Sequence, residues 1–211
     1  MFRIGTAYPH EDMYRAASQF AKEVYGQRLH AMIAGTPDVF AYARYGTSLV
    51  GCVGLYHADA SRQVLLETYA PDALSTISGS PNTDRRLLGE LGTRAVRLPD
   101  DIRERNADIS LAITATVVSI AYLSNIRYLV LTSNRTASLI AQELGIELIR
   151  LCEPDISHLD KEFQDNWKEY FRVKQYCFGC ALTTPAGCRR TLAHLEMKGI
   201  FSENDDLRHA A

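Results

Sequence analysis

The sequence predicts an α/β fold in which helices flank a mixed central sheet. Two β-prone runs, 39–43 and 49–56, are separated by a short glycine-containing loop, which is typical of an antiparallel hairpin. Further along, apolar strands at 90–98, 128–132 and 146–151 alternate with helix-sized segments, and this spacing favours parallel or mixed pairing. Hydrophobic residues make up 46% of the 211 residues and no linker divides the chain, so we expect one buried core.

The first half of the chain contains three further predicted elements. Apolar residues at helical spacing predict a helix over 11–25, and Gly26 then supplies a stop signal. The run 63–69 predicts a third strand after a polar break. The stretch 71–88 is rich in Ser, Gly, Pro and Asp and predicts short helices joined by loops.

The second half of the chain contains two predicted helices and one more strand. Apolar residues from Ile109 to Leu123 lie on one side of a long helix, and Asn134 caps a second helix that runs through Leu144 and ends at Gly145. The segment 170–182 alternates as a strand does.

Three features narrow the class of protein: its net charge, its first residues and its cysteines. A net charge of -2 and an isoelectric point near 6.3 give no general attraction to nucleic acid or to an anionic membrane. The chain shows no secretion-signal pattern, and no apolar run suggests a stable membrane span, so we expect a cytoplasmic protein. Five cysteines, an odd number, favour reduced thiols over a disulfide scaffold.

Several short motifs resemble the thermostable hemolysin family in order and spacing. The motifs are Tyr25–Leu29, Leu65–Tyr69, Glu90–Ala95 and Tyr128–Thr132, and Trp167, Tyr170 and Phe171 extend the match. The resemblance covers roughly residues 20 to 180. It implies a fold similar to that of the N-acetyltransferases (GNAT-like) and the autoinducer synthases, formed by an acyltransferase-like domain over 1–185 and followed by a helical extension over 186–211.

The resemblance leaves three functions open. The first is an N-acyltransferase-like enzyme of secondary metabolism, which moves an acyl group from a carrier-protein or CoA thioester to a small-molecule amine without a tightly bound cofactor. The second, suggested by the family name, is a membrane-active hemolysin, although the chain shows no strongly basic amphipathic helix. The third is a catalytically silent domain that binds a carrier protein or an acyl-derived ligand.

Autoinducer synthases carry a Glu, two intervening residues and an Arg on the strand that corresponds to 90–96. Here Glu90 fits this motif, Thr93 occupies the third position after it, and the arginine falls one place later at Arg94. On a regular strand Arg94 would point to the opposite face, unless a bulge restores it. The same strand, through Ala95 and Val96, is expected to lie beside the thioester.

Glu90 and Glu67 are the two carboxylates expected to remove the amine proton. Both lie in apolar runs predicted as strands, so either carboxylate can be held in a cleft with a raised pKa. The alternative is that they are surface carboxylates, and their partners would then be Arg62, Arg85 or Arg86.

The loop 99–107 bears on the acyl donor. CoA enzymes of this fold cradle the pyrophosphate with a glycine-containing loop, and this loop has no glycine, which disfavours free CoA. Arg103 and Arg105 are candidates to contact the phosphopantetheine of an acyl carrier protein. The alternative interpretation is a solvated connection.

Polar and aromatic residues outside that strand have two interpretations each. Ser133 and Asn134 follow an apolar strand and either face a ligand or form a plain helix cap. Trp167 and Tyr170, together with Tyr69 and Tyr176, either wall an acyl or aromatic pocket or pack the core.

Three carboxy-terminal cysteines are candidates for several roles. Cys177 and Cys180 form half of a typical zinc site, which Cys188 and His194 would complete. As small apolar residues they fit a structural role better, and we expect no metal site here. Cys177 or Cys180 as an acyl-accepting nucleophile is a further alternative.

Overall fold

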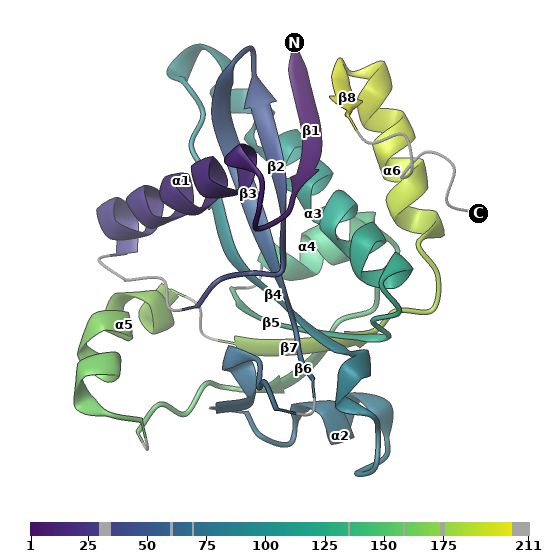
Figure 1. Ribbon diagram of the computed structural model, residues 1–211. Coiled ribbons are helices and arrows are strands. Elements are labelled where there is room, and N and C mark those ends of the chain that lie inside the picture. Colours follow the sequence, from purple (N-terminus) through teal and green to yellow (C-terminus); the bar gives the residue numbers. More distant parts are fainter. Residues whose placement is uncertain are drawn as a thin grey trace.

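An eight-stranded mixed sheet organises the chain in this computed structural model (Figure 1). The structure describes residues 1–29, 35–59, 61–68, 70–134, 136–157, 159–173 and 176–203. The strands are β1 Phe2–Ala7, β2 Val39–Tyr45, β3 Ser48–His57, β4 Leu88–Val96, β5 Tyr128–Ser133, β6 Ile149–Cys152, β7 Tyr176–Ala181 and β8 Ile200–Ser202. The helices are α1 Asp12–Leu29, α2 Ala73–Ser78, α3 Asn106–Leu123, α4 Thr136–Glu143, α5 Lys161–Val173 and α6 Ala186–Met197, with 3-10 turns η1 Leu65–Thr68, η2 Arg85–Leu87 and η3 Asp100–Arg105.

The pairing confirms the predicted mixed sheet, whose strand order is β6-β7-β5-β4-β3-β2-β1-β8. The predicted hairpin is the antiparallel pair β2 and β3, and β4 pairs in parallel with β5 across the helical crossover α3. β7 lies between β5 and β6 and is antiparallel to both. The pairs β4–β5 and β1–β8 are therefore parallel, and the other neighbouring strands of the sheet are antiparallel.

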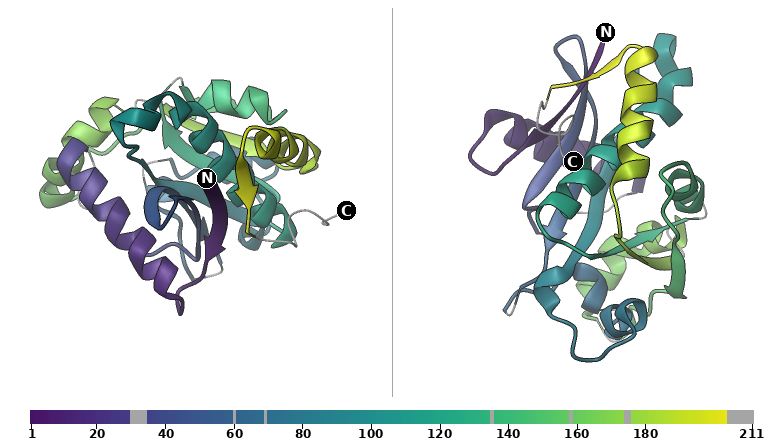
Figure 2. Two further views of the ribbon diagram at one scale, coloured as in Figure 1. Left: turned by 90° about the horizontal axis from the view of Figure 1, so that it is seen from above. Right: turned by 90° about the vertical axis from the view of Figure 1, so that its right-hand side faces the viewer.

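Helices cover both faces of the sheet, as the side and top views show (Figure 2). α1, α2 and α5 pack on one face, and α3, α4 and α6 pack on the other. Among the described helices, the stretch Asp100–Leu123 is long and apolar enough to cross a membrane, and 61% of its apolar 18-residue window is buried inside the structure. The apolar surface of α3 is therefore largely the core of the fold.

Several predicted boundaries are wrong for local reasons. Within the predicted strand 63–69, residues Leu65–Thr68 form the 3-10 turn η1 instead, because the carboxylate of Glu67 accepts a hydrogen bond from the Val64 N–H and closes the turn. α1 continues past Gly26 to Leu29. The segment 170–182 is not one strand: α5 ends at Val173 and β7 follows, because Phe163, Trp167 and Phe171 recur at helical spacing. β6 begins at Ile149, and β1 has no counterpart among the predicted strands.

The carboxy-terminal segment contributes a helix and an edge strand to this fold. β8 pairs in parallel with β1, and α6 packs against α3. Gly187 at the start of α6 lies directly against the end of α4, since a Cβ there would be 1.8 Å from the carbonyl oxygen of Leu144. A glycine is therefore required for this close approach.

Candidate active site

A cavity opens where β4 and β5 diverge. Their parallel register ends at the pair Glu90 and Val130, and the residues that follow on both strands form the walls. The cavity has an empty volume of about 770 Å³. Its lining is mostly apolar: Tyr25, Val53, Leu91, Gly92, Thr93, Arg94, Thr114, Val118, Leu129, Leu131, Thr132, Ser133, Ala137, Ile140, Ala141, Leu144, Ile146, Leu148, Tyr170 and Cys180.

A β-bulge shapes this cavity at the centre of β4. Cys52 pairs with Ala95 and Gly54 pairs with Gly92, so Val53 alone opposes two residues, Thr93 and Arg94. Thr93 has a φ of 53°, a left-handed conformation that β-branched residues rarely adopt. Such strain costs about 1–3 kcal/mol and tends to persist at functional sites. The bulge that would bring Arg94 to the cleft is therefore present.

A second, smaller cavity lies against the first. Its empty volume is about 360 Å³, and its lining is Tyr25, Tyr56, Leu65, Glu90, Gly92, Thr93, Trp167 and Tyr170. The two cavities share Tyr25, Gly92, Thr93 and Tyr170. At Gly92 a Cβ would lie 3.0 Å from the Tyr56 ring, so the glycine leaves room for the tyrosine. The two cavities thus meet at the bulge of β4.

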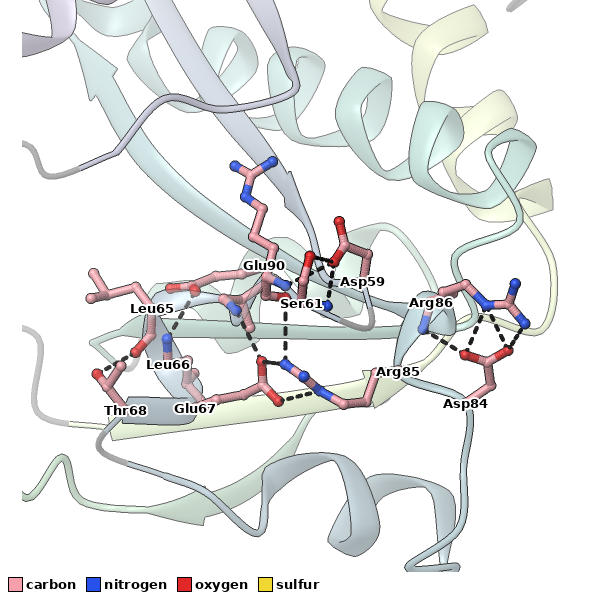
Figure 3. Close-up of polar contacts among 12 residues, drawn as sticks. Asp59, Ser61, Leu65, Leu66, Glu67, Thr68, Asp84, Arg85, Arg86 and Glu90 are labelled. Carbon is pink, nitrogen blue, oxygen red and sulfur yellow. Dashed lines mark hydrogen bonds and ion pairs between the residues drawn. The ribbon is translucent and has the colours of Figure 1, made fainter.

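Glu90 is the buried carboxylate of the smaller cavity. It is 5% exposed, and its Oε2 accepts a hydrogen bond of 2.9 Å from the Leu66 N–H (Figure 3). Burial raises the pKa of Glu90 to about 7, against the opposing effect of the Leu66 and Leu65 N–H groups. No ion pair to Glu90 forms within the described ranges. A carboxyl group in this state can accept and release a proton near neutral pH.

Aromatic side chains enclose the same space. The Trp167 and Tyr170 rings meet edge to face at 4.8 Å, and Tyr25 stacks on Tyr170 at 6.1 Å. The Tyr56 hydroxyl hydrogen-bonds Thr93 Oγ1. Burial raises the pKa of Tyr25 and of Tyr56, so both phenols stay protonated at neutral pH. The walls are therefore apolar rings with hydroxyl tips.

Arg94 lies on the wall of the larger cavity. Its Nε is buried and has no hydrogen-bond partner in the described structure. Burial lowers the pKa of the guanidinium, and the nearby Tyr25 phenol opposes this effect. A buried donor without a partner is costly, so a ligand oxygen here would satisfy it.

Comparisons with known proteins establish the family. The thermostable hemolysin family matches residues 7–181, most of the chain. The chain belongs to the thermostable hemolysin family. A comparison with curated proteins finds no match.

Solved structures similar to this hemolysin-family chain include synthases named for acyl products. The CoA-dependent acyl-homoserine lactone synthase BjaI, solved with SAM and isopentyl-CoA, is 15% identical at a TM-score of 0.60, with 99% of this chain and 96% of that chain covered. FeeM, an N-acyl amino acid synthase from uncultured soil microbes, is 14% identical at 0.57, covering 93% and 99%. The AHL synthase LasI is 15% identical at 0.55, covering 88% and 91%. These likenesses confirm the predicted GNAT-like, autoinducer synthase-like fold.

Some predicted site residues of this thermostable hemolysin lie together at the two cavities. They are Glu90, Thr93, Arg94, Ser133, Trp167 and Tyr170. Ala95 and Val96 pack into the cores on opposite faces of the sheet, and neither lines a cavity. Asn134 also lies outside the lining, and its carbonyl oxygen accepts the Ala137 N–H at 3.2 Å.

Glu67 and Arg105 line neither of the two cavities, and their side chains interact with other residues. Glu67 pairs with Arg85 at 2.8 Å on η1, as the alternative interpretation required, and Figure 3 shows the two ends joined away from Glu90. Arg105 contacts Asp108 at 3.1 Å and the Lys198 carbonyl oxygen at 2.9 Å. Arg103 is exposed, with Asp100 3.8 Å away. Tyr69 lies outside the described residues.

The carboxy-terminal cysteines do not assemble a metal site in the described part of the chain. Cys177 and Cys180 lie in different core clusters on opposite faces of β7, and no group of three His, Cys, Asp or Glu side chains gathers among the described residues. Burial raises the pKa of Cys180 to about 12, so its thiol stays protonated. A protonated thiol is a poor nucleophile.

Sequence reasoning missed several residues of the site. Tyr25 and Tyr56 come from α1 and β3, far from β4 in sequence, and Ala137 and Ala141 from α4 close the larger cavity. Tyr25 was visible only as part of a family motif. The other three carry no signal, because apolar helix and strand positions look like core until the strands are seen to diverge.

Proposed function

We propose that this protein is an N-acyltransferase that moves an acyl group from a thioester to the amine of a small molecule. The observation that carries the proposal is the meeting of two cavities at the bulge of β4, with Glu90 in the smaller one. The larger, apolar cavity suits an acyl chain, and the smaller one suits the acceptor. The synthase names of the similar structures support the same reaction class.

The residues at the bulge have separate roles in this reaction. The bound ammonium first loses one proton to solvent; the neutral amine nitrogen then attacks the thioester carbonyl carbon, the new C–N bond forms, the C–S bond breaks, and the thiol leaves with the second proton. Ionised Glu90 takes the proton lost by the amine, directly or through water, and returns it to the leaving sulfur or to solvent. Arg94 donates to an oxygen of the acyl donor from the cavity wall.

The residues at the start of α3 bear on the identity of the acyl donor. Asp100 and Asp101 occupy η3, and Asp108 in the first turn of α3 is paired with Arg105 and Lys198. Carboxylates at this helix start would repel a pyrophosphate that sought its N–H groups. We therefore propose an acyl carrier protein as the donor, with cytoplasmic location as its corollary.

The reaction itself can be tested with the purified protein and a panel of acyl N-acetylcysteamine thioesters and amines. Mass spectrometry is expected to find an N-acyl amide, with release of one free thiol per amide. Thiol release without amide, or ligand binding with neither product, would instead indicate a hydrolase or a silent binding domain and would remove this proposal.

The donor preference is a separate expectation. A carrier-linked thioester should give a higher kcat/KM than the matching CoA thioester. Arg103→Glu should weaken only the carrier-dependent reaction, because this side chain is exposed while Arg105 is held by Asp108. The control is Arg172→Glu, an exposed arginine on α5. A clear preference for CoA contradicts the carrier donor and leaves acyl transfer standing.

A further inference from the structure

The smaller cavity holds one carboxylate and four aromatic rings. Glu90 supplies the carboxylate, and the rings come from α1, β3 and α5: Tyr25, Tyr56, Trp167 and Tyr170. None of its described lining residues is cationic. The cavity is therefore built for a ligand with positive charge and an apolar body.

Two guanidinium groups near the smaller cavity, those of Arg85 and Arg62, are already paired. Arg85 binds Glu67 at 2.8 Å, and Arg62 binds Asp38 at 2.6 Å. A ligand carboxylate in the smaller cavity would lie beside Glu90, and none of the described lining residues would give it a partner of opposite charge. Burying an unpaired charge is strongly unfavourable, and a neighbouring like charge adds to the cost.

An ammonium group in the smaller cavity, unlike a carboxylate, is attracted by the residues that line it. A cation over aromatic faces is attracted to the rings, and ionised Glu90, which is buried, adds a direct ion pair. This cavity is the smaller of the two that meet at the bulge, which suits a small molecule.

We propose that the acyl acceptor is a small primary amine that carries no carboxylate, with its nitrogen at Glu90 and its apolar body against the aromatic walls. This inference rests on the proposed acyl-transfer function. It narrows the acceptor to amines without a carboxylate, which excludes amino acids. Arg94 is the one described cation at the junction, and it lines the neighbouring cavity, where the acyl donor lies.

Binding of matched aromatic ligands, measured by calorimetry at pH 8 without donor, tests the acceptor class independently of turnover. Phenethylamine, phenylalanine and 3-phenylpropionate differ only in the amine and carboxylate that they carry. Phenethylamine is expected to bind at least tenfold tighter than phenylalanine, with 3-phenylpropionate weakest. Equal or tighter binding of either carboxylate-bearing ligand overturns the proposal.

Substitutions test whether the ligand nitrogen lies at Glu90. Glu90→Gln should weaken phenethylamine binding about tenfold or more, whereas Glu162→Gln, an exposed carboxylate on α5, should leave it unchanged. A loss of the same size in both variants overturns the site. If Arg94→Met selectively weakens phenylalanine, the guanidinium recognises a ligand carboxylate, and the proposal is wrong.

Product analysis tests the acceptor class separately from acyl transfer itself. N-acylphenylalanine formed in preference to N-acylphenethylamine overturns the acceptor class and leaves acyl transfer intact. Failure of phenethylamine, phenylalanine and the other amines of the panel to give an amide with any donor, carrier-linked ones included, overturns acyl transfer and, with it, the role of this cavity as an acceptor site.

Discussion

Glu90→Gln is expected to lower turnover roughly a hundredfold or more, the usual scale for a positioned acid or base. Glutamine retains the acceptor for the Leu66 N–H but cannot take a proton from the amine. Steady-state rates of amide formation, divided by the concentration of folded protein, measure the effect. Arg94 and the aromatic walls remain in place, so substrate binding should change less than kcat.

The pH dependence of this variant gives a second readout. The wild-type rate should rise as pH passes through about 7, since Glu90 works as a base only when ionised and burial raises its pKa to about 7. Glu90→Gln should lose that limb of the profile. A rate limb that persists in the variant would assign the titration to another group.

The thermal stability of the wild-type protein should fall over the same pH range in which its rate rises. The raised pKa means that the stability contributed by protonated Glu90 is fully present below its ordinary pKa of 4.5 and is lost as pH rises through about 7. The corresponding loss is roughly 3 kcal/mol. Glu90→Gln avoids it, so at pH 8 the variant should melt at the same or a higher temperature than wild type. A lower melting temperature with intact activity would make Glu90 a structural residue.

Ala141→Leu should shorten the acyl chain that the protein accepts. Ala141 is buried on α4 and lines the larger cavity, and three added carbons fill space that a long chain needs. Each methylene in an apolar pocket is worth about 1–3 kcal/mol, so kcat/KM for an octanoyl donor should fall about a hundredfold or more. Acetyl transfer should change little.

The matched control is Gln142→Leu, the neighbouring exposed position of the same helix. It adds the same side chain on the outside and should leave both donors unaffected. Overpacking costs about 1–3 kcal/mol, so melting curves must accompany the rates. Equal loss with octanoyl and acetyl donors would show that the cavity does not hold the acyl chain.

The sequence by itself determined the mixed α/β fold and most of its elements. The hairpin, the strand–helix alternation and the helix stop at Gly145 are local patterns, and apolar spacing with turn residues specifies them. Glu90 was recognisable too, because a carboxylate in an apolar strand is uncommon.

Only the tertiary structure decided which residues form the site. The bulge at Thr93 and Arg94 depends on how β4 pairs with β3, and β-bulges leave no fixed pattern in one strand's sequence. Glu67 looked equivalent to Glu90 until folding paired it with Arg85. The cavities exist because β4 and β5 separate after Glu90, a long-range geometry that brings Tyr25 and Tyr170 beside β4 although they lie far from it in the chain.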